Sequence, residues 1–227
     1  MKEVFELHSK ELLTLQTNDP QLAKLIGLIG EISFDIRQDR FSALIGSIIG
    51  QQLSVKAAST ISSRFFKLLN NEVNPSTIEK LSDDTMREAG LSKQKISYIR
   101  DLCAKVNTSE VDLLTIDNVS DEEVIELLTK VKGIGIWTAE MFLIFSLSRK
   151  NILSLGDVGL QRACKWLYNS SNDVDKKALL KEKGKSWTPF SSIASLYLWA
   201  AIDEGFVENF KTIDEAISSK KSAFRHS

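Results

Sequence analysis

The apolar residues of this chain recur mostly at the spacing of an α-helix. Between residues 41 and 49 the apolar side chains lie three or four positions apart, which predicts one buried helix face. Residues 124–131 repeat this spacing and predict a second amphipathic helix. Residues 137–147 are apolar nearly all round, as a buried central helix would be. Helix is therefore the dominant prediction.

Capping and turn residues support the same interpretation. Ser120 precedes the second run and Glu123 follows three residues later, which is the signature of a capping box. Ser54 is placed to cap a helix over residues 55–67. Alternating strand patterns and hairpin dipeptides such as Asn-Gly are missing. We expect an all-α chain of roughly ten helices, in which the first forty or so residues are also helical. Its three prolines suit loops or helix starts: Pro20, Pro75 and Pro189.

Two polar segments qualify this picture. Residues 169–185 are the most polar stretch and carry five lysines, which favours a solvated helix and loop over a patch that faces nucleic acid. Residues 218–227 are expected to fray, as chain ends often do. No segment has the composition of a linker between domains, and no internal repeat is evident.

Composition limits the function classes. The chain has 227 residues, 43% of them apolar and 26% charged, which is an ordinary globular composition. Its 29 Lys and Arg against 30 Asp and Glu give a net charge of −1, which excludes a protein that coats nucleic acid through bulk positive charge. No run of about 18 apolar residues predicts a membrane span, and the N-terminus lacks a signal-peptide core. We expect an intracellular protein in a reducing compartment, with no membrane partner.

The chain is poor in cysteine and histidine, with two of each. Cys103 and Cys164 lie far apart and cannot by themselves form a disulfide framework, a zinc site or an iron–sulfur cluster. The two histidines, His8 and His226, are both near the termini, which disfavours histidine-ligated metal hydrolysis and Ser-His-Asp chemistry. No metal site and no cofactor are predicted.

Residues 127–139 carry the most informative motif. Their sequence, LLTKVKGIGIWTA, predicts the end of a helix, a Gly-x-Gly turn and the start of a second, buried helix. Gly133 and Gly135 allow a tight turn and close approach by a ligand. The turn leads into a helix N-terminus, whose free N–H groups attract anions such as a DNA phosphate. The alternative is an ordinary helical hairpin whose glycines only cap the first helix.

Three further motifs accompany this hairpin in the chain. Residues 155–160 read LGDVGL, residues 49–58 read IGQQLSVKAA, and residues 187–190 read WTPF with Trp199 beyond them. Together with the hairpin, and in their order along the chain, they resemble the helix-hairpin-helix DNA glycosylase superfamily. The similarity is to its alkylbase branch, of the 3-methyladenine DNA glycosylase II type, and covers about residues 38–203.

The resemblance implies an all-α fold of two packed helical subdomains, with an active-site cleft between them. Residues 40–148 would form the middle subdomain, including the hairpin at 121–147. Residues 1–39 plus 149–227 would form the second subdomain, which carries Asp157. Because only about forty residues precede the matching region, the chain is similar to compact members without an N-terminal β domain. The two cysteines also exclude the iron–sulfur cluster of other branches.

By resemblance, Asp157 is the catalytic residue. Removal of a base from deoxyribose builds positive charge on the sugar, which a fixed carboxylate can stabilise, or the carboxylate can align the attacking water. The alternative role is an N-cap for a helix over residues 158–168, and the two roles can coexist.

The resemblance also suggests which residues hold the extruded base, and that this protein does not cleave the DNA strand. Bifunctional members carry a lysine that forms a Schiff base with the sugar, at the position that Trp137 occupies here, so no strand cleavage is expected. A damaged base must leave the stack, and Trp137, Met141 and Trp199 match positions of the pocket that receives it. Core packing is the alternative for all three, and it is favoured for Met141.

The remaining implied contacts are with the DNA duplex. Gln51 and Gln52, expected at a helix start after Gly50, match the family's DNA wedge, with Gln52 at the wedge position itself. An ordinary surface or packing pair is the alternative. Helix-hairpin-helix turns often hold a monovalent cation, and this one could do so. The expected DNA-binding hairpin consists of Lys132, Gly133, Ile134, Gly135 and Thr138.

The sequence thus predicts a monomeric, monofunctional DNA glycosylase. It would flip out and hydrolytically excise alkylated purines, of the 3-methyladenine and 7-methylguanine type, from double-stranded DNA in base-excision repair. One alternative is a glycosylase of the same superfamily for uracil, hypoxanthine or an oxidised base. Another is a non-catalytic protein that uses the hairpin only to bind DNA.

Overall fold

A computed structural model describes residues 1–70 and 72–224 of the chain. The contacts within it divide the chain into two units. Unit 1 consists of Met1 and Ile36–Ser148, and unit 2 consists of Lys2–Asp35 and the chain from Arg149 onward.

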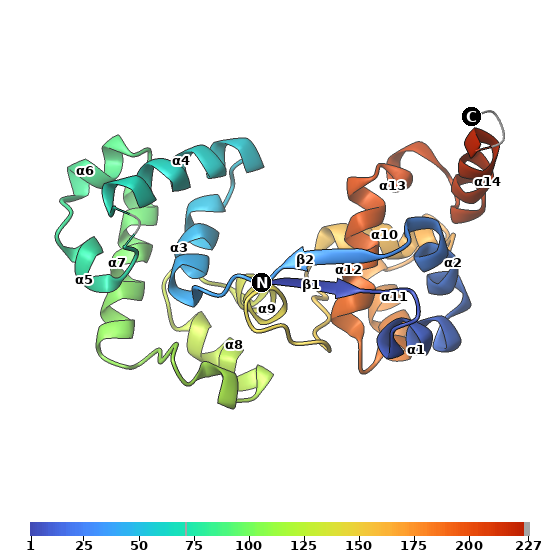
Figure 1. The fold of residues 1–227 in the computed structure, drawn as a ribbon, viewed down its shortest axis with the longest axis horizontal. Coiled ribbons are helices and arrows are strands. Elements are labelled where there is room, and N and C mark those ends of the chain that lie inside the picture. Colours follow the sequence, from blue (N-terminus) through green and yellow to red (C-terminus); the bar gives the residue numbers. More distant parts are fainter. Residues whose placement is uncertain (71, 225–227) are drawn as a thin grey trace. The chain divides into compact units, whose positions relative to one another are not determined.

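Unit 1 is a group of helices arranged around α3 and α7 (Figure 1). Helix α7 packs against α3, α5 and α6, and α3 packs also against α4 and α9. The face of α3 predicted from residues 41–49 is buried, because its apolar side chains form part of the unit's core. The elements of unit 1 are α3 (Arg40–Gly50), α4 (Val55–Leu68), α5 (Pro75–Glu79), α6 (Asp83–Glu88), α7 (Lys93–Asn107), η1 (Ile116–Asn118), α8 (Asp121–Thr129) and α9 (Ile136–Phe145).

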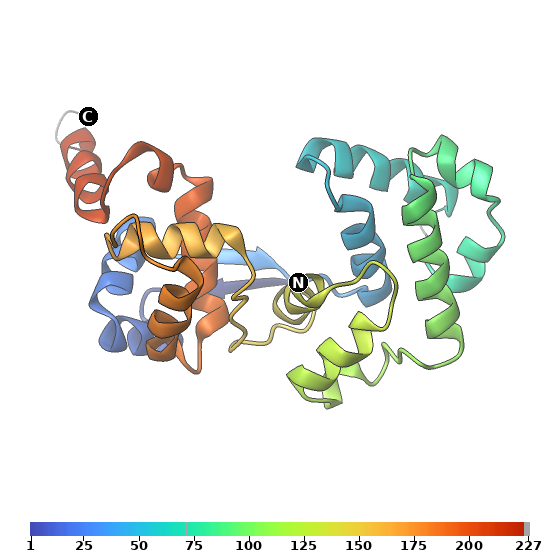
Figure 2. The ribbon, with the colours of Figure 1, turned by 180° about the vertical axis from the view of Figure 1, so that it is seen from behind.

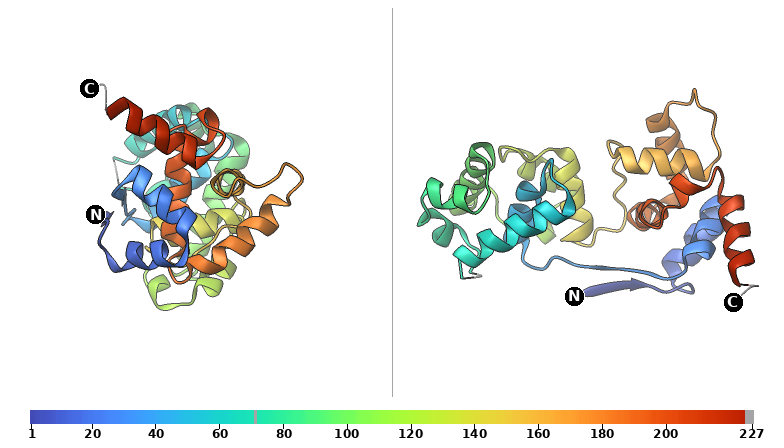
Figure 3. Two further views of the ribbon diagram at one scale, coloured as in Figure 1. Left: turned by 90° about the vertical axis from the view of Figure 1, so that its right-hand side faces the viewer. Right: turned by 90° about the horizontal axis from the view of Figure 1, so that it is seen from above.

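Unit 2 is built on α12, which packs against α2, α10 and α13. Its core includes the fully buried side chains of Trp187 and Tyr197. Helix α14 lies against α2 (Figure 3). The elements of unit 2 are β1 (Lys2–Phe5), α1 (Lys10–Asn18), α2 (Pro20–Ile29), β2 (Ile32–Asp35), α10 (Val158–Leu167), α11 (Lys176–Lys183), η2 (Gly184–Trp187), α12 (Ser191–Asp203), α13 (Phe206–Asn209) and α14 (Ile213–Phe224).

A buried carboxylate ties several elements of unit 2 together. Asp19 caps α2, because its Oδ1 accepts the N–H groups of Gln21 and Leu22, each at 3.0 Å. Its Oδ2 accepts hydrogen bonds from the Tyr168 hydroxyl and from the Trp187 indole. The buried charge is therefore compensated by donors from distant segments, as a buried carboxylate requires.

The all-α prediction is confirmed, and so are its local signals. The Ser120–Glu123 capping box forms in both directions, and Ser54 caps α4. Pro20 and Pro75 each occupy the first turn of a helix, while Pro189 lies in the turn before α12.

Three expectations about the chain were wrong in detail. The first residues are not all helical, because β1 and β2 pair antiparallel, with Phe5 opposite Ile32. Residues 32–35 read ISFD and alternate apolar and polar, so a short strand signal was present there and was overlooked. The described residues form fourteen α-helices rather than about ten, since helices of four to six residues escape a periodicity analysis. The stretch expected to fray is helical as far as Phe224, and residues 225–227 lie outside the described part.

Candidate functional site

Asp157 is the N-cap of α10. Its Oδ1 accepts the backbone N–H of Leu160 at 2.8 Å, so the capping alternative considered for this residue is confirmed. The residue is 8% exposed. The indole Nε1 of Trp199, on α12, lies 3.5 Å from the same oxygen. Two N–H groups from different helices therefore fix this carboxylate.

The loop that leads into α10 is also held in place. Gln161 donates from Nε2 to the carbonyl of Leu155 at 2.8 Å, and the N–H of Asp157 bonds the carbonyl of Ser154 at 3.1 Å. A Cβ on Gly159 would lie 3.0 Å from Oδ1 of Asp157 and 3.3 Å from Cδ1 of Ile202. Because glycine has no Cβ, residue 159 does not crowd the carboxylate of Asp157.

The arrangement has a definite chemical capacity. A nearly buried carboxylate whose orientation is set by backbone and indole donors is preorganised negative charge, which stabilises positive charge developing beside it. Because the orientation is set by the fold, little reorganisation is needed when that charge appears.

The hairpin of unit 1 joins α8 to α9 (Figure 2). Gly133 has a φ of +79°, a left-handed conformation that favours glycine. Gly135 is the N-cap of α9 and supplies no side-chain hydrogen bond. An uncapped helix N-terminus next to a tight glycine turn presents backbone donors, so the local structure suits an anion.

The side chains of the hairpin divide into two groups. Lys132 and Trp137 are exposed, Trp137 to 50%, whereas Ile134 and Thr138 are buried. Residues 137–147 were expected to be a buried helix. Helix α9 is buried over most of its length, but its first turn is open.

The other two pocket candidates differ in exposure. Met141 is buried in the core-facing part of α9, in agreement with the packing role that its sequence context favoured. Trp199 is half-buried beside Asp157.

The paired glutamines were expected at the start of a helix, but they follow the end of one. Helix α3 ends at Gly50, and Gln51 and Gln52 form the turn that leads to α4. The backbone leaves the helix at Gln51, whose ψ is 130°, and Gln52 follows with a left-handed φ of +58°. The Nε2 of Gln51 donates to the carbonyl of Gly133 at 2.7 Å.

Sequence reasoning missed the residues that support the hairpin and the turn after α3. They lie on α7, and they are Lys95, Tyr98 and Asp101. Burial lowers the pKa of the Lys95 amine. Only their three-residue spacing on a helix could have indicated a shared face, and nothing local indicated what that face meets.

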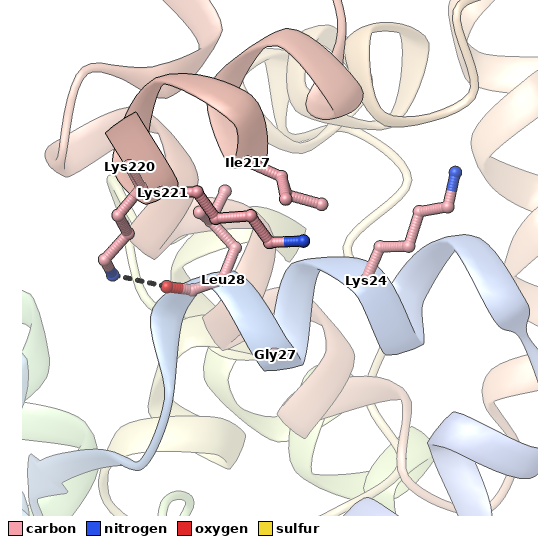
Figure 4. Close-up of a pocket in the computed structure, with 6 residues that line it drawn as sticks. All are labelled: Lys24, Gly27, Leu28, Ile217, Lys220 and Lys221. Carbon is pink, nitrogen blue, oxygen red and sulfur yellow. Dashed lines mark hydrogen bonds between the residues drawn. The ribbon is translucent and has the colours of Figure 1, made fainter. Parts of the chain in front are cut away.

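Other features of the described residues lie apart from this site. The five lysines of residues 169–185 lie mainly on α11, mostly exposed, with Leu179 and Leu180 buried beneath, so the solvated-helix interpretation is confirmed. A hollow of about 400 Å³ lies between α2 and α14 of unit 2 (Figure 4). Two of its three lysines are engaged, one with Asp214 and one with the Leu28 carbonyl, and none of the candidate site residues lines it.

No three His, Cys, Asp or Glu side chains in residues 1–70 and 72–224 gather as a metal ion would require. Over the same residues, no helix is both long enough and apolar enough to cross a membrane.

Comparison with known proteins identifies the family. The model of the "HhH-GPD superfamily base excision DNA repair protein" matches residues 45–189. A crystal structure of a DNA-3-methyladenine glycosidase from Bacillus halodurans aligns with a TM-score of 0.87 and 41% identity, over 95% of this chain and 99% of that one. A 3-methyladenine DNA glycosylase of Schizosaccharomyces pombe, in complex with abasic DNA, aligns with a TM-score of 0.75 and 30% identity, over 84% of this chain and 95% of that one.

The chain belongs to the HhH-GPD superfamily of base excision DNA repair proteins, as its motifs indicated. A curated relative from Bacillus subtilis is 31% identical over 72% of this chain, and the aligned region spans 59% of that protein's length.

Proposed function

We propose that this protein is a monofunctional DNA glycosylase that excises alkylated purines, of the 3-methyladenine and 7-methylguanine type, from duplex DNA. The observation that carries the proposal is the carboxylate of Asp157, fixed by Leu160 and Trp199 within a chain of this superfamily. Relatives named for the excision of 3-methyladenine support the choice of substrate.

Asp157 would act on the sugar. As the C1′–N bond breaks, its electron pair goes to the base and positive charge develops on the deoxyribose, beside the carboxylate. Water then adds to C1′ and loses one proton, which leaves an abasic site. The donors to Oδ1 hold the carboxylate in place during this step.

An alkylated purine needs little help to leave. Alkylation at N3 or N7 makes the base cationic, so it departs neutral without a general acid. Electron-rich indole rings attract such a cation. We assign this stacking role to Trp137, whose ring is half exposed, and to Trp199, with Met141, about one turn after Trp137 on α9, as an apolar wall.

The remaining contacts would hold the duplex. Backbone donors at Gly133 and Gly135 bind a phosphate, Lys132 adds a charge at the same hairpin, and Gln52 fills the space that the extruded base leaves. Since Trp137 replaces the lysine of bifunctional relatives, the reaction stops at the abasic site. The protein acts as a monomer inside the cell, in the nucleoid of a prokaryote or the nucleus of a eukaryote.

The test is release of free base. DNA treated with a methylating agent is incubated with the protein, and released bases are separated by chromatography. We expect free 3-methyladenine and 7-methylguanine, and little release from duplexes with a single uracil, hypoxanthine or 8-oxoguanine. Preferential release of one of the neutral bases would change the substrate. DNA binding without release of any base would show that the protein is a DNA-binding protein and not an enzyme.

A further inference from the structure

One side of α7 supports both segments that are proposed to contact DNA. Lys95, Tyr98 and Asp101 follow one another at three-residue intervals on this helix. The Nζ of Lys95 donates hydrogen bonds to the carbonyls of Ile49 and Gln51, at 2.7 and 2.9 Å. These are carbonyls at the end of α3, which the helix itself leaves without partners. Lys95 therefore fixes the start of the turn between α3 and α4.

Tyr98 and Asp101, further along α7, hold the hairpin. The ring of Tyr98 covers Gly133 so closely that an added Cβ would lie 2.1 Å from ring atom Cδ2. One turn further along, Oδ2 of Asp101 accepts the backbone N–H of Lys132 at 2.9 Å. The backbone on the N-terminal side of the hairpin glycines is thus anchored to the same helix as the turn.

The two glutamines of the turn differ in their contacts. Gln51 reaches across to the hairpin, where its amide donates to the Gly133 carbonyl at 2.7 Å. Gln52 is exposed in a left-handed conformation, and its side chain makes no hydrogen bond within the described part of the chain. Their neighbouring positions in the sequence therefore do not imply one shared role.

We propose that Gln51 is a positioning residue, which fixes the hairpin relative to the turn so that both meet the duplex as one body. Gln52 keeps the role of entering the duplex that the proposed function gives it. This inference rests on the proposed function, in which Gln52 fills the gap in the base stack, and gives Gln51 a different role. An amide held by the hairpin cannot fill a gap in the base stack without giving up its bond to Gly133.

The experiment compares Gln51→Met with Gln52→Met, since methionine has nearly the same length as glutamine but no N–H donor. Hydrogen exchange of the amides of residues 131–137 is measured in the free protein. Affinity for an undamaged duplex is measured by fluorescence anisotropy. Base extrusion is followed with 2-aminopurine at saturating protein. Circular dichroism and the melting temperature verify that both variants are folded.

We expect Gln51→Met to accelerate exchange in the hairpin and to weaken undamaged-duplex binding about three- to tenfold, the net contribution of one neutral hydrogen bond. We expect Gln52→Met to change hairpin exchange less and to reduce the extrusion signal more. Wild-type hairpin exchange in Gln51→Met, or a larger loss of extrusion in it than in Gln52→Met, would overturn the inference. Neither exchange nor undamaged-duplex binding requires catalysis, so a failure to release any base would overturn the proposed function alone.

Discussion

The indole Nε1 of Trp199 lies 3.5 Å from Oδ1 of Asp157, the oxygen that also accepts the Leu160 N–H at 2.8 Å. The aromatic candidate for base stacking and the candidate catalytic carboxylate therefore share one hydrogen-bonded arrangement in unit 2. A change at either residue should alter the position of the other. The consequences can be separated by substitutions that change charge, space or backbone freedom one at a time.

Replacement of Asp157 by asparagine removes the charge and keeps the cap. Asparagine is as good an N-cap as aspartate, so we expect the melting temperature to change little. Loss of the charge that opposes the developing cation should slow base release about 10²- to 10³-fold. The measurement is single-turnover release of methylated purines at saturating enzyme. Asp157→Ala serves as the comparison, because it should lose both activity and about 1 kcal/mol of capping stability.

The outcome for Asp157→Asn distinguishes catalysis from capping. A capping role alone predicts that the asparagine variant releases base at the wild-type rate while the alanine variant is destabilised. That pattern would remove Asp157 from the mechanism.

Gly159→Ala should disturb the carboxylate without altering its chemistry. The new Cβ would lie 3.0 Å from Oδ1 of Asp157 and 3.3 Å from Ile202 Cδ1, so one of them must move. We expect base release to fall about tenfold or more, since small displacements of a catalytic group are costly. Gly156→Ala is the matched control, because no atom lies within 4 Å of its added Cβ. Equal rates in the two variants would show that the position of the carboxylate is not critical.

The sequence alone was sufficient to predict structural features that depend on residues close together in the chain. The apolar spacing of residues 41–49 and the Ser120–Glu123 box each describe one helix, and both were confirmed. The hairpin motif indicated the family because glycine spacing and the following helix are contiguous in the chain. Pairing of β1 with β2 joins residues about thirty positions apart, and the alternation of residues 32–35 does not identify the strand they pair with.

The site shows the same division between local and long-range signals. Asp157 could be recognised as a cap and as a family position from its own neighbours. Its bond to Trp199 and the link from Gln51 to Gly133 could not, since each connects segments forty or more residues apart. The positive φ of Gln52 was also missed, because a left-handed glutamine has no sequence signature and is set by the surrounding structure.

The absence of a lysine at position 137 predicts the products of the reaction. Incubation with lesion DNA and sodium borohydride should trap no covalent protein–DNA adduct, because Trp137 cannot form a Schiff base. Gel electrophoresis should show strand breaks only after alkali treatment of the abasic product. A bifunctional glycosylase run in parallel verifies that trapping works. A trapped adduct would mean that some other amine of this chain reaches C1′.

Gly133→Ala should damage the hairpin through both its backbone and its neighbour. A left-handed φ of +79° costs an alanine about 1 kcal/mol, and the clash with the Tyr98 ring adds roughly 1–3 kcal/mol. We expect weaker DNA binding and a lower melting temperature. Gly135→Ala is the control for the melting temperature, with ordinary φ and no atom within 4 Å of the new Cβ. Tyr98→Ala in the Gly133→Ala background should recover part of the stability, and no recovery would assign the whole loss to the backbone.

The two cysteines should be unreactive in the folded protein. Burial raises the pKa of both thiols, Cys103 and Cys164, to about 12, so almost no thiolate exists at pH 8. Labelling with 5,5′-dithiobis(2-nitrobenzoate) should be slow in buffer and rapid in urea, and single Cys→Ala variants assign each thiol. Because folding favours the protonated form, this contribution to stability is fully present below pH 9 and declines as the pH rises toward 12. Rapid labelling of either thiol in buffer at pH 8 would mean that its surroundings open without global unfolding.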